Sequence, residues 1–231
     1  MAKDNISDRH NSTESYREKR AVSAGSNPCM MATDRLILRP WHESDAESLY
    51  RYASDPDIGP IAGWPPHTSV DNSLEIIRTV FAAPEVYAVV LKDTNEPVGS
   101  CGIMFSNGLH SANMTQREAE IGYWIGKPYW GQGLIPEAVN ALLSRCFNEL
   151  GLDAVWCGHY DGNVKSQRVI EKSGFNYHHT NHDIVTPLGD KRTEHFYLMT
   201  KDDYQTLSRS SNLSENGNKR YYNKSCKGDR S

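Results

Sequence analysis

Hydrophobic residues along the chain fall into short runs with two different spacings. Continuous or alternating apolar runs between turn residues predict β-strands, and apolar residues that recur every three to four positions predict helices. Seven runs have the strand pattern, and they lie at residues 35–39, 86–91, 97–103, 119–125, 153–158, 175–177 and 195–199. Asp93-Thr94-Asn95-Glu96 separates the second run from the third and predicts a hairpin turn.

Helical spacing occurs in four segments, at residues 43–53, 69–81, 134–150 and 163–173. The clearest is the third, where one apolar stripe is formed by Val139, Leu142, Leu143, Cys146, Phe147 and Leu150. Pro136 lies in its first turn, where a missing N–H costs nothing, and Gly151 is placed to end it. This alternation predicts one α/β (α+β) domain around a mixed central sheet of about seven strands with flanking helices.

The two ends of the chain lack these patterns. Residues 1–31 are rich in Ser, Asn, Lys, Arg and Glu, residues 208–231 have the same character, and the mean hydropathy of the chain is −0.65. Segments of this composition bury too little apolar surface to fold. We therefore expect a disordered extension over residues 1–31, a folded domain over residues 32–207 and a disordered basic tail over residues 208–231.

Charge is distributed unevenly along the 231 residues. Residues 31–207 carry 14 Lys and Arg against 23 Asp and Glu, a net charge of −9, whereas residues 208–231 carry a net charge of +4. An acidic folded part argues against a nucleic-acid partner and suits a cationic amine as substrate.

The sequence contains no apolar run long enough to cross a membrane and no apolar leader segment, so we expect no membrane partner. Its five cysteines form no Cys-x-x-Cys pair, which argues against a disulfide framework or a zinc site. We therefore expect a reducing, cytoplasmic location. The histidines at 178, 179 and 182 have no convincing metal spacing, and we expect no metal.

A glycine-containing turn precedes the clearest helix, in the segment Trp130-Gly131-Gln132-Gly133-Leu134-Ile135. The first turn of a helix has unpaired N–H groups and the positive end of the helix dipole, so this segment predicts an anion site. No P-loop run occurs, and Pro136 stands where a dinucleotide fingerprint needs Gly or Ala. On these residues alone, glycines that merely close a turn are an equal alternative.

Several ordered motifs together resemble the GNAT superfamily of acetyltransferases, and within it the branch that acetylates the amino termini of ribosomal proteins. The resemblance covers about residues 33–204. The motifs that carry it are Arg35-Leu36-Ile37-Leu38-Arg39, Gly63-Trp64-Pro65-Pro66-His67, Glu120-Ile121-Gly122-Tyr123-Trp124-Ile125, Trp130-Gly131-Gln132-Gly133 with Glu137-Ala138, Asn163-x-x-Ser166 and Glu171-Lys172-Ser173-Gly174-Phe175.

The resemblance implies a half-open sheet whose fourth and fifth strands separate, with acetyl-coenzyme A (acetyl-CoA) as the cosubstrate in the gap. The thiol arm of coenzyme A then pairs with the end of the fourth strand at Trp124 and Ile125, like an added strand. The pyrophosphate rests on the backbone of Gly131, Gln132, Gly133, Leu134 and Ile135.

Two more cofactor contacts follow from the resemblance. Asn163 caps the helix that it begins and also bonds the pantetheine arm, beside Ser166. The family's usual Arg or Gln three residues before the first glycine is Pro128 in this chain, so phosphate binding is expected to rest on backbone amides.

Amide formation from an amine and a thioester needs a base for the amine and a proton or hydrogen bond for the departing thiolate. Glu120, just before the expected separation, is the candidate base, with Glu118 on the same strand face in reserve and a structural carboxylate as the alternative. The family's usual acid, a tyrosine seven residues after the asparagine, is Ile170 here. Ser166 is the replacement that the resemblance suggests, through a hydrogen bond to sulfur or a proton relay.

Trp64, His67 and Tyr123 are the candidates for lining the acceptor site. The first two belong to the proline-rich loop in which the family places substrate selection, although a tryptophan between Gly and Pro also suits a simple anchor. We expect direct acetyl transfer to a primary amine, of a protein amino terminus or of a small molecule, through a ternary complex. Cys101 and Cys157 lie in apolar strands, which argues against an acyl-enzyme.

Two other readings stay open at this point. The missing tyrosine makes a catalytically silent acyl-CoA sensor conceivable, and a nucleotide-binding protein could use the same glycine turn. The residues identify neither the acceptor nor the oligomeric state, for which a monomer and a homodimer are both open.

Overall fold

The structure is a computed structural model that describes residues 30–105 and 114–214. The extension expected at the amino terminus and residues 215–231 of the expected tail therefore lie outside the described residues, apart from Met30 and Met31. The strands are β1 (Met31–Ala32), β2 (Leu36–Arg39), β3 (Val86–Leu91), β4 (Pro97–Phe105), β5 (Glu118–Ile125), β6 (Ala154–Tyr160), β7 (Asn176–Val185) and β8 (Lys191–Thr200).

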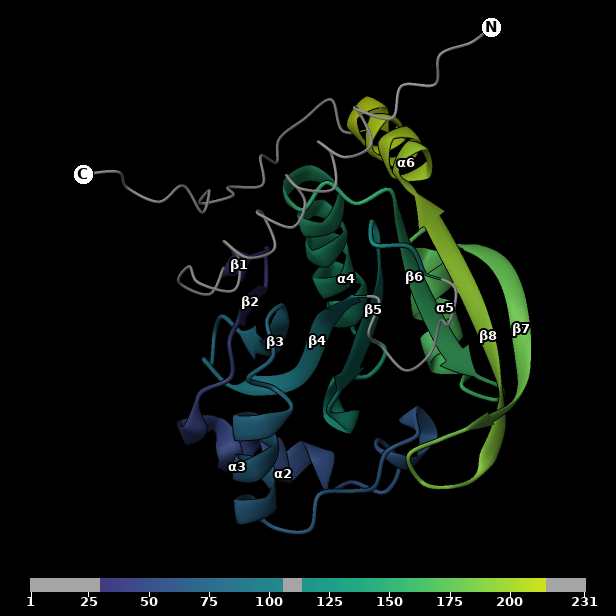
Figure 1. Cartoon of the computed structure of the whole chain (residues 1–231). Helices are drawn as coiled ribbons and strands as arrows, with labels where there is room; N and C mark the ends of the chain where they lie inside the picture. Colours follow the sequence, from purple (N-terminus) through teal and green to yellow (C-terminus); the bar gives the residue numbers. More distant parts are fainter. Residues whose placement is uncertain (1–29, 106–113, 215–231) are drawn as a thin grey trace, which may run out of the picture.

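Five α-helices accompany these strands in the described part of the chain. They are α2 (Ala46–Ala53), α3 (Val70–Thr79), α4 (Leu134–Ser144), α5 (Val164–Lys172) and α6 (Lys201–Ser214). Short 3-10 turns precede α2, lie within the proline-rich loop and follow β5, and a π-helical segment, Arg145–Glu149, continues α4. The alternation of strands and helices is the one that the sequence predicts (Figure 1).

All eight strands form one sheet in the order β1-β2-β3-β4-β5-β6-β8-β7. Neighbouring strands are antiparallel except β5 and β6, which are parallel, so the sheet is mixed as predicted. The sheet has one strand more than the seven expected, because Met31 and Ala32 add a short edge strand opposite Leu38 and Ile37.

The central feature of the sheet is the separation of β5 from β6. Their register covers only three pairs and ends where Glu120 lies opposite Trp156, although the strands run on to Ile125 and Tyr160. In Figure 1 the two strands lie together near α6 and diverge towards their carboxyl ends. They are the fourth and fifth of the predicted strands, so the separation implied by the family resemblance is confirmed.

Both faces of the sheet are covered by apolar side chains. Tyr87 and Val89 of β3 enter the larger core cluster, which includes α4, whereas the alternate residues Ala88 and Val90 enter a second cluster with α2 and α3. All six residues of the predicted apolar stripe are buried, as are Leu134 and Ile135 at the start of α4. Full burial of such a side chain contributes about 1.5–3 kcal/mol, so α4 fixes the position of the turn that precedes it.

The carboxyl end of α4 differs from the expected regular helix. The amide of Leu150 donates to the carbonyl of Arg145 over 2.9 Å, five residues back, which is the π-helical pattern. The Arg145 side chain is buried, and its guanidinium contacts Glu85 over 2.7 Å and Glu149 over 2.6 Å. Gly151 then ends the segment with a φ of +69°, as predicted.

The last two strands are much longer than the expected segments at 175–177 and 195–199. Each strand of the β7–β8 hairpin has 10 residues, and most side chains of β7 are exposed or half-buried. This edge strand is rich in His and Asn and therefore lacks the apolar signal from which strands are predicted.

α6 extends to Ser214 and so enters the segment for which no regular structure was expected. A reciprocal cap begins the helix: the amide of Thr200 donates to Asp203 over 2.9 Å, and the amide of Asp203 donates to the Thr200 hydroxyl over 3.2 Å.

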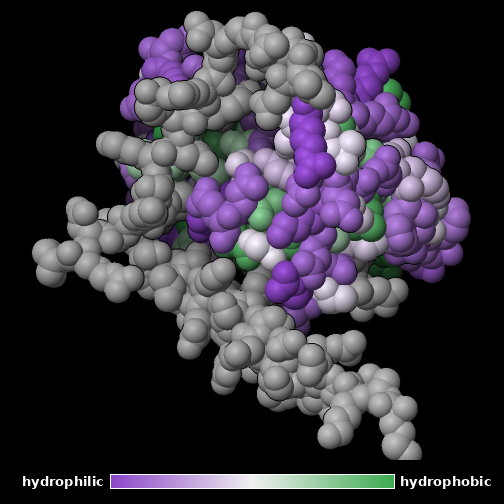
Figure 2. Space-filling model, turned by 90° about the horizontal axis from the view of Figure 1, so that it is seen from above, coloured by the Kyte–Doolittle hydropathy of each residue, from purple (hydrophilic) through white to green (hydrophobic). Residues whose placement is uncertain are grey.

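The described surface carries many polar side chains. Figure 2 shows the end of the molecule that bears α6, where hydrophilic residues outnumber the small apolar areas between them. None of the described helices has the length and hydrophobicity needed to span a membrane.

Candidate functional site

The glycine turn before α4 has the backbone shape of an anion site. Gly131 and Gly133 have φ angles of +76° and +75°, a left-handed conformation that glycine adopts without strain. A Cβ at Gly131 would meet no atom within 4 Å, and one at Gly133 would meet only Arg35, at 3.7 Å. The turn is therefore open, and α4 begins at Leu134 without a side-chain cap on its first amides.

Two side chains hold this turn in place. The side-chain amide of Gln132 donates to the backbone carbonyl of Pro128 over 2.9 Å. Arg35, just before β2, donates to the carbonyl of Gln132 over 2.9 Å and to Glu137 over 2.7 Å. Sequence reasoning placed Arg35 in a strand and missed this role, because nothing local indicates a partner about a hundred residues away.

Glu137 joins the start of α4 to the amino-terminal segment. Burial by itself would raise the pKa of this carboxyl, but hydrogen bonds from Thr33 and Arg35 outweigh it and hold the pKa below its ordinary value. Glu137 is therefore ionised at neutral pH and keeps the Arg35 guanidinium at the turn.

The end of β5 presents towards the gap a backbone edge that pairs with no described strand, although its Ile121 carbonyl accepts a hydrogen bond from the Cys157 thiol. On one side Trp124 and Ile125 pair with Ser100 and Gly99 of β4, whereas beyond Glu120 no described strand pairs with the other side. The Trp130 indole donates to the carbonyl of Ile125 over 3.0 Å and ties the glycine turn to the strand end. An extended ligand segment fits such an edge as an added strand.

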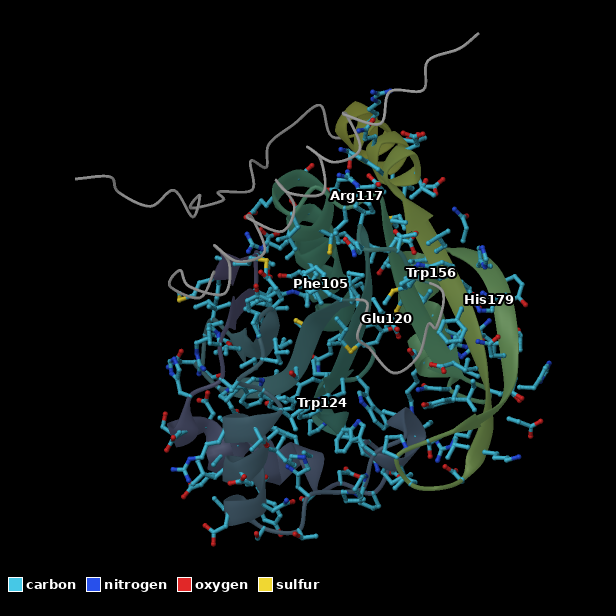
Figure 3. All side chains as sticks on the ribbon, in the orientation of Figure 1. Phe105, Arg117, Glu120, Trp124, Trp156 and His179 are labelled. Carbon is cyan, nitrogen blue, oxygen red and sulfur yellow. The ribbon has the colours of Figure 1, made fainter. Side chains whose placement is uncertain are left out.

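Glu120 lies at the point where β5 and β6 begin to separate. Figure 3 shows it between Phe105 of β4 and Trp156 of β6. Its side chain is buried, with 5% of the residue exposed. Glu118, the reserve candidate, accepts a hydrogen bond from the Trp156 indole over 2.8 Å, which gives it a structural partner.

A second buried carboxylate, Glu194 of β8, lies on the same sheet face as Glu120 and was missed by sequence reasoning. β6 lies between β5 and β8. Its residue between the two carboxylates is Gly158, and a Cβ at that position would lie 3.0 Å from a Glu194 carboxylate oxygen. Burial raises the pKa of the Cys157 thiol, and the Glu120 and Glu194 carboxylates raise it further. Both carboxylates therefore lie near the same residue of β6. Glu194 lies in a polar stretch of β8 that carried no strand signal.

The opposite face of β5 carries Tyr123, whose hydroxyl reaches α5. It lies 3.0 Å from the Ser166 hydroxyl and 3.2 Å from the Ser166 carbonyl oxygen. Asn163 caps α5, as predicted, by accepting a hydrogen bond from the Ser166 amide over 3.1 Å. The structure thus places Tyr123, which was expected to line the acceptor site, beside Ser166 and on the face of β5 opposite to Glu120.

The proline-rich loop lies against the carboxyl ends of β5 and β6. Trp64 packs edge-on against Trp124 with 5.8 Å between ring centroids, and Gly63 approaches the Tyr160 ring so closely that a Cβ would meet it at 2.8 Å. His67 is buried, and its Nδ1 lies 2.8 Å from the Ser73 hydroxyl. Burial lowers the pKa of His67, so the ring is neutral and anchors the loop.

These features, a split sheet with an open glycine turn at one strand end, can be compared with known proteins. The family model of the acetyltransferase (GNAT) domain matches residues 35–176, which is more than half of the chain. The chain belongs to the GNAT acetyltransferase family. The predicted enzyme class, an N-acetyltransferase that uses acetyl-CoA, is therefore confirmed for this protein.

Individual relatives agree with this assignment. The uncharacterised N-acetyltransferase p20 of Bacillus licheniformis is 29% identical over 151 residues, which cover 62% of this chain and 80% of p20. YdaF of Bacillus subtilis, provisionally named as a ribosomal N-acetyltransferase, is 41% identical over 75 residues, which cover 32% of this chain and 39% of YdaF. This GNAT relative agrees with the predicted branch.

A solved acetyltransferase structure has the same fold. It is that of the microcin C7 self-immunity acetyltransferase MccE in complex with acetyl-CoA and AMP, with a TM-score of 0.60 and 20% identity. The match covers 72% of this chain and 93% of MccE. Within residues 30–105 and 114–214, no group of three or more His, Cys, Asp or Glu residues is arranged to hold a metal ion.

Proposed function

We propose that this GNAT protein transfers the acetyl group of acetyl-CoA directly to a primary amine within a ternary complex. We take residues 32–207 as its acetyltransferase domain. One observation carries the proposal: the gap between β5 and β6 has a buried carboxylate, Glu120, on one face and the hydroxyl pair of Tyr123 and Ser166 on the other. Amine activation and leaving-group stabilisation thus have separate groups on either side of one strand.

The chain's residues suit acetyl-CoA. The open backbone of Gly131 and Gly133 and the first amides of α4 supply donors for the pyrophosphate. The unpaired edge of β5 at Trp124 and Ile125 supplies backbone groups for the pantetheine arm. These contacts need no side chain at Pro128, which agrees with the departure from the family pattern there.

Glu120 takes the first proton in the reaction that we propose. The ammonium group of the acceptor gives a proton to the Glu120 carboxylate, directly or through a water molecule, and becomes a nucleophilic amine. Its nitrogen attacks the thioester carbonyl, the C–N bond forms, and the C–S bond breaks with its electron pair on sulfur. Ser166, at the first turn of α5, then faces the developing charge on the thiolate.

The acceptor side of the gap favours a positively charged amine. Glu120 and Glu194 are both buried there, and two desolvated carboxylates on one face favour a cation nearby. Trp64 and Trp124 add aromatic surface at the carboxyl ends of β5 and β6, which attracts ammonium groups. Protein amino termini and small-molecule amines both have this chemistry.

A panel of amines tests the proposed function. We expect amine-dependent release of free thiol from acetyl-CoA with at least one of four acceptor types: amino-terminal peptides, aminoglycosides, polyamines and amino acids. The measurement is thiol titration together with mass detection of an acetylated amine. Tight acetyl-CoA binding without thiol release from any acceptor would instead support the acyl-CoA sensor.

The glycine turn gives a separate prediction about the cosubstrate. We expect Gly133→Val to raise the KM for acetyl-CoA about tenfold to a hundredfold, because a left-handed valine is strained and hydrogen bonds to a charged group contribute about 1.5–3 kcal/mol. Gly151→Val is the matched control, since Gly151 lies at the other end of the same helix with a φ of +69° and open space around it. Equal increases in both variants would mean that strain, and not phosphate binding, is the cause.

A further inference from the structure

The usual leaving-group position of this family has no hydroxyl in this chain. It is occupied by Ile170 of α5, whose side chain is fully buried in the core. An isoleucine carries no ionisable proton, so another group must neutralise the thiolate. Ser166 alone is a poor source, because an aliphatic hydroxyl is a much weaker acid than a phenol.

A phenol lies beside Ser166 from another element of the fold. Tyr123 comes from β5, and its hydroxyl lies 3.0 Å from the Ser166 hydroxyl, 3.2 Å from the Ser166 carbonyl oxygen and beside the Cys157 thiol. The Ser166 amide is held in turn by the Asn163 side chain at 3.1 Å. The hydroxyl pair therefore spans the gap in which β5 and β6 have no backbone pairing, and α5 and β5 fix it from both sides.

We propose that Tyr123 supplies, through Ser166, the proton that neutralises the departing thiolate. This inference rests on the proposed acetyl transfer. Tyr123 is a positioning and relay residue, since it reaches the sulfur only through the Ser166 hydroxyl. A β-strand tyrosine thus replaces the helical tyrosine whose position holds Ile170.

The proton transfers balance. As the C–S bond breaks, the sulfur takes the hydroxyl proton of Ser166, and the Ser166 oxygen takes the hydroxyl proton of Tyr123. The tyrosinate then takes a proton from water. The acceptor ammonium loses two protons over the cycle: one goes to Glu120, which passes it to solvent, and one goes to solvent as the amide forms. One proton taken from water ends on the thiol, so the balance is one thiol and one proton released.

The surroundings of Tyr123 keep its proton in place between turnovers. Burial raises the pKa of the Tyr123 hydroxyl well above its ordinary value, and the neighbouring Cys157 thiol raises it further. Tyr123 is therefore protonated at the start of each cycle.

Tyr123→Phe, Ser166→Ala and the double variant test the relay, with acetyl-CoA and the best amine of the panel. We expect each single variant to lower kcat about tenfold or more while the KM for acetyl-CoA changes less than twofold. The double variant is expected to be no slower than the slower single variant, because both changes break one chain of proton transfers. Tyr87→Phe is the control: it removes another buried hydroxyl, which lies on β3 and bonds Glu85 just before that strand, and is expected to leave kcat unchanged.

The relay would be overturned, with acetyl transfer intact, by an unchanged kcat in Tyr123→Phe or by losses in the single variants that multiply in the double variant. A rise in KM without a fall in kcat would also overturn it, since that is the effect of a packing residue. If the wild-type protein releases no thiol with any amine, the proposed function fails, and the relay fails with it.

Discussion

Glu120→Gln is expected to lower kcat for amine acetylation about a hundredfold or more at pH 7. Glutamine preserves the shape of this buried side chain but cannot accept the proton of the acceptor ammonium, and a positioned base contributes about 10²–10⁴ in rate. The deficit should shrink as the pH rises, because a growing fraction of the amine is then already neutral in solution. Thiol release across a pH series measures both effects.

Glu118→Gln is the comparison that assigns the base. Glu118 lies on the same strand face but accepts a hydrogen bond from the Trp156 indole, so its substitution should have the smaller effect on kcat. The reverse order of the two variants would transfer the base role to Glu118. Equal, small effects would show that neither carboxylate takes the proton.

Arg145→Met is expected to lower the free energy of unfolding by about 3–5 kcal/mol, the usual cost of removing one partner from a buried ion pair. The side chains of Arg145 and Glu85 are only 10% and 4% exposed, so the substitution takes two charge-assisted hydrogen bonds from a buried carboxylate. In a domain of this size the melting temperature should fall by roughly 10 °C. Urea unfolding followed by circular dichroism measures the change.

Arg78→Met provides the matched control, because Arg78 and Glu43 form an ion pair whose side chains are 51% and 61% exposed. Exposed pairs contribute about 0–1 kcal/mol, so this variant should unfold almost like the wild type. Adding Glu85→Gln to Arg145→Met should recover part of the loss, since the buried charge is then removed. A loss as large in Arg78→Met as in Arg145→Met would contradict this account.

Local features of the site were predictable from the sequence because their causes are local. The left-handed conformation of Gly131 and Gly133 follows from residue type and from the amphipathic helix that starts directly after them. The same holds for Asn163, whose side chain caps the helix that it precedes. The separation of β5 and β6 came only from the family resemblance, because no residue of either strand signals where pairing stops.

Other features depend on contacts between residues far apart in the chain. Arg35 reaches Gln132 and Glu137, and the approach of Glu194 to Gly158 depends on the register of β6 and β8. Sequence patterns describe the chain one segment at a time, so they assign Arg35 to a strand end and pass over Glu194. The length of the β7–β8 hairpin was missed for another reason, since backbone pairing alone organises its exposed polar residues.

The three residue pairs between β5 and β6 have a consequence for how the domain holds together. Among the described strands they are the only pairing between the two halves of the sheet. The proposed site uses both halves: Glu120 and Tyr123 lie on β5, Glu194 lies on β8, and Ser166 lies on α5, which follows β6. A molecule seated in the gap touches both halves and joins them. Its binding free energy therefore adds to the free energy of unfolding, and by mass action this added stability grows with the concentration of the ligand.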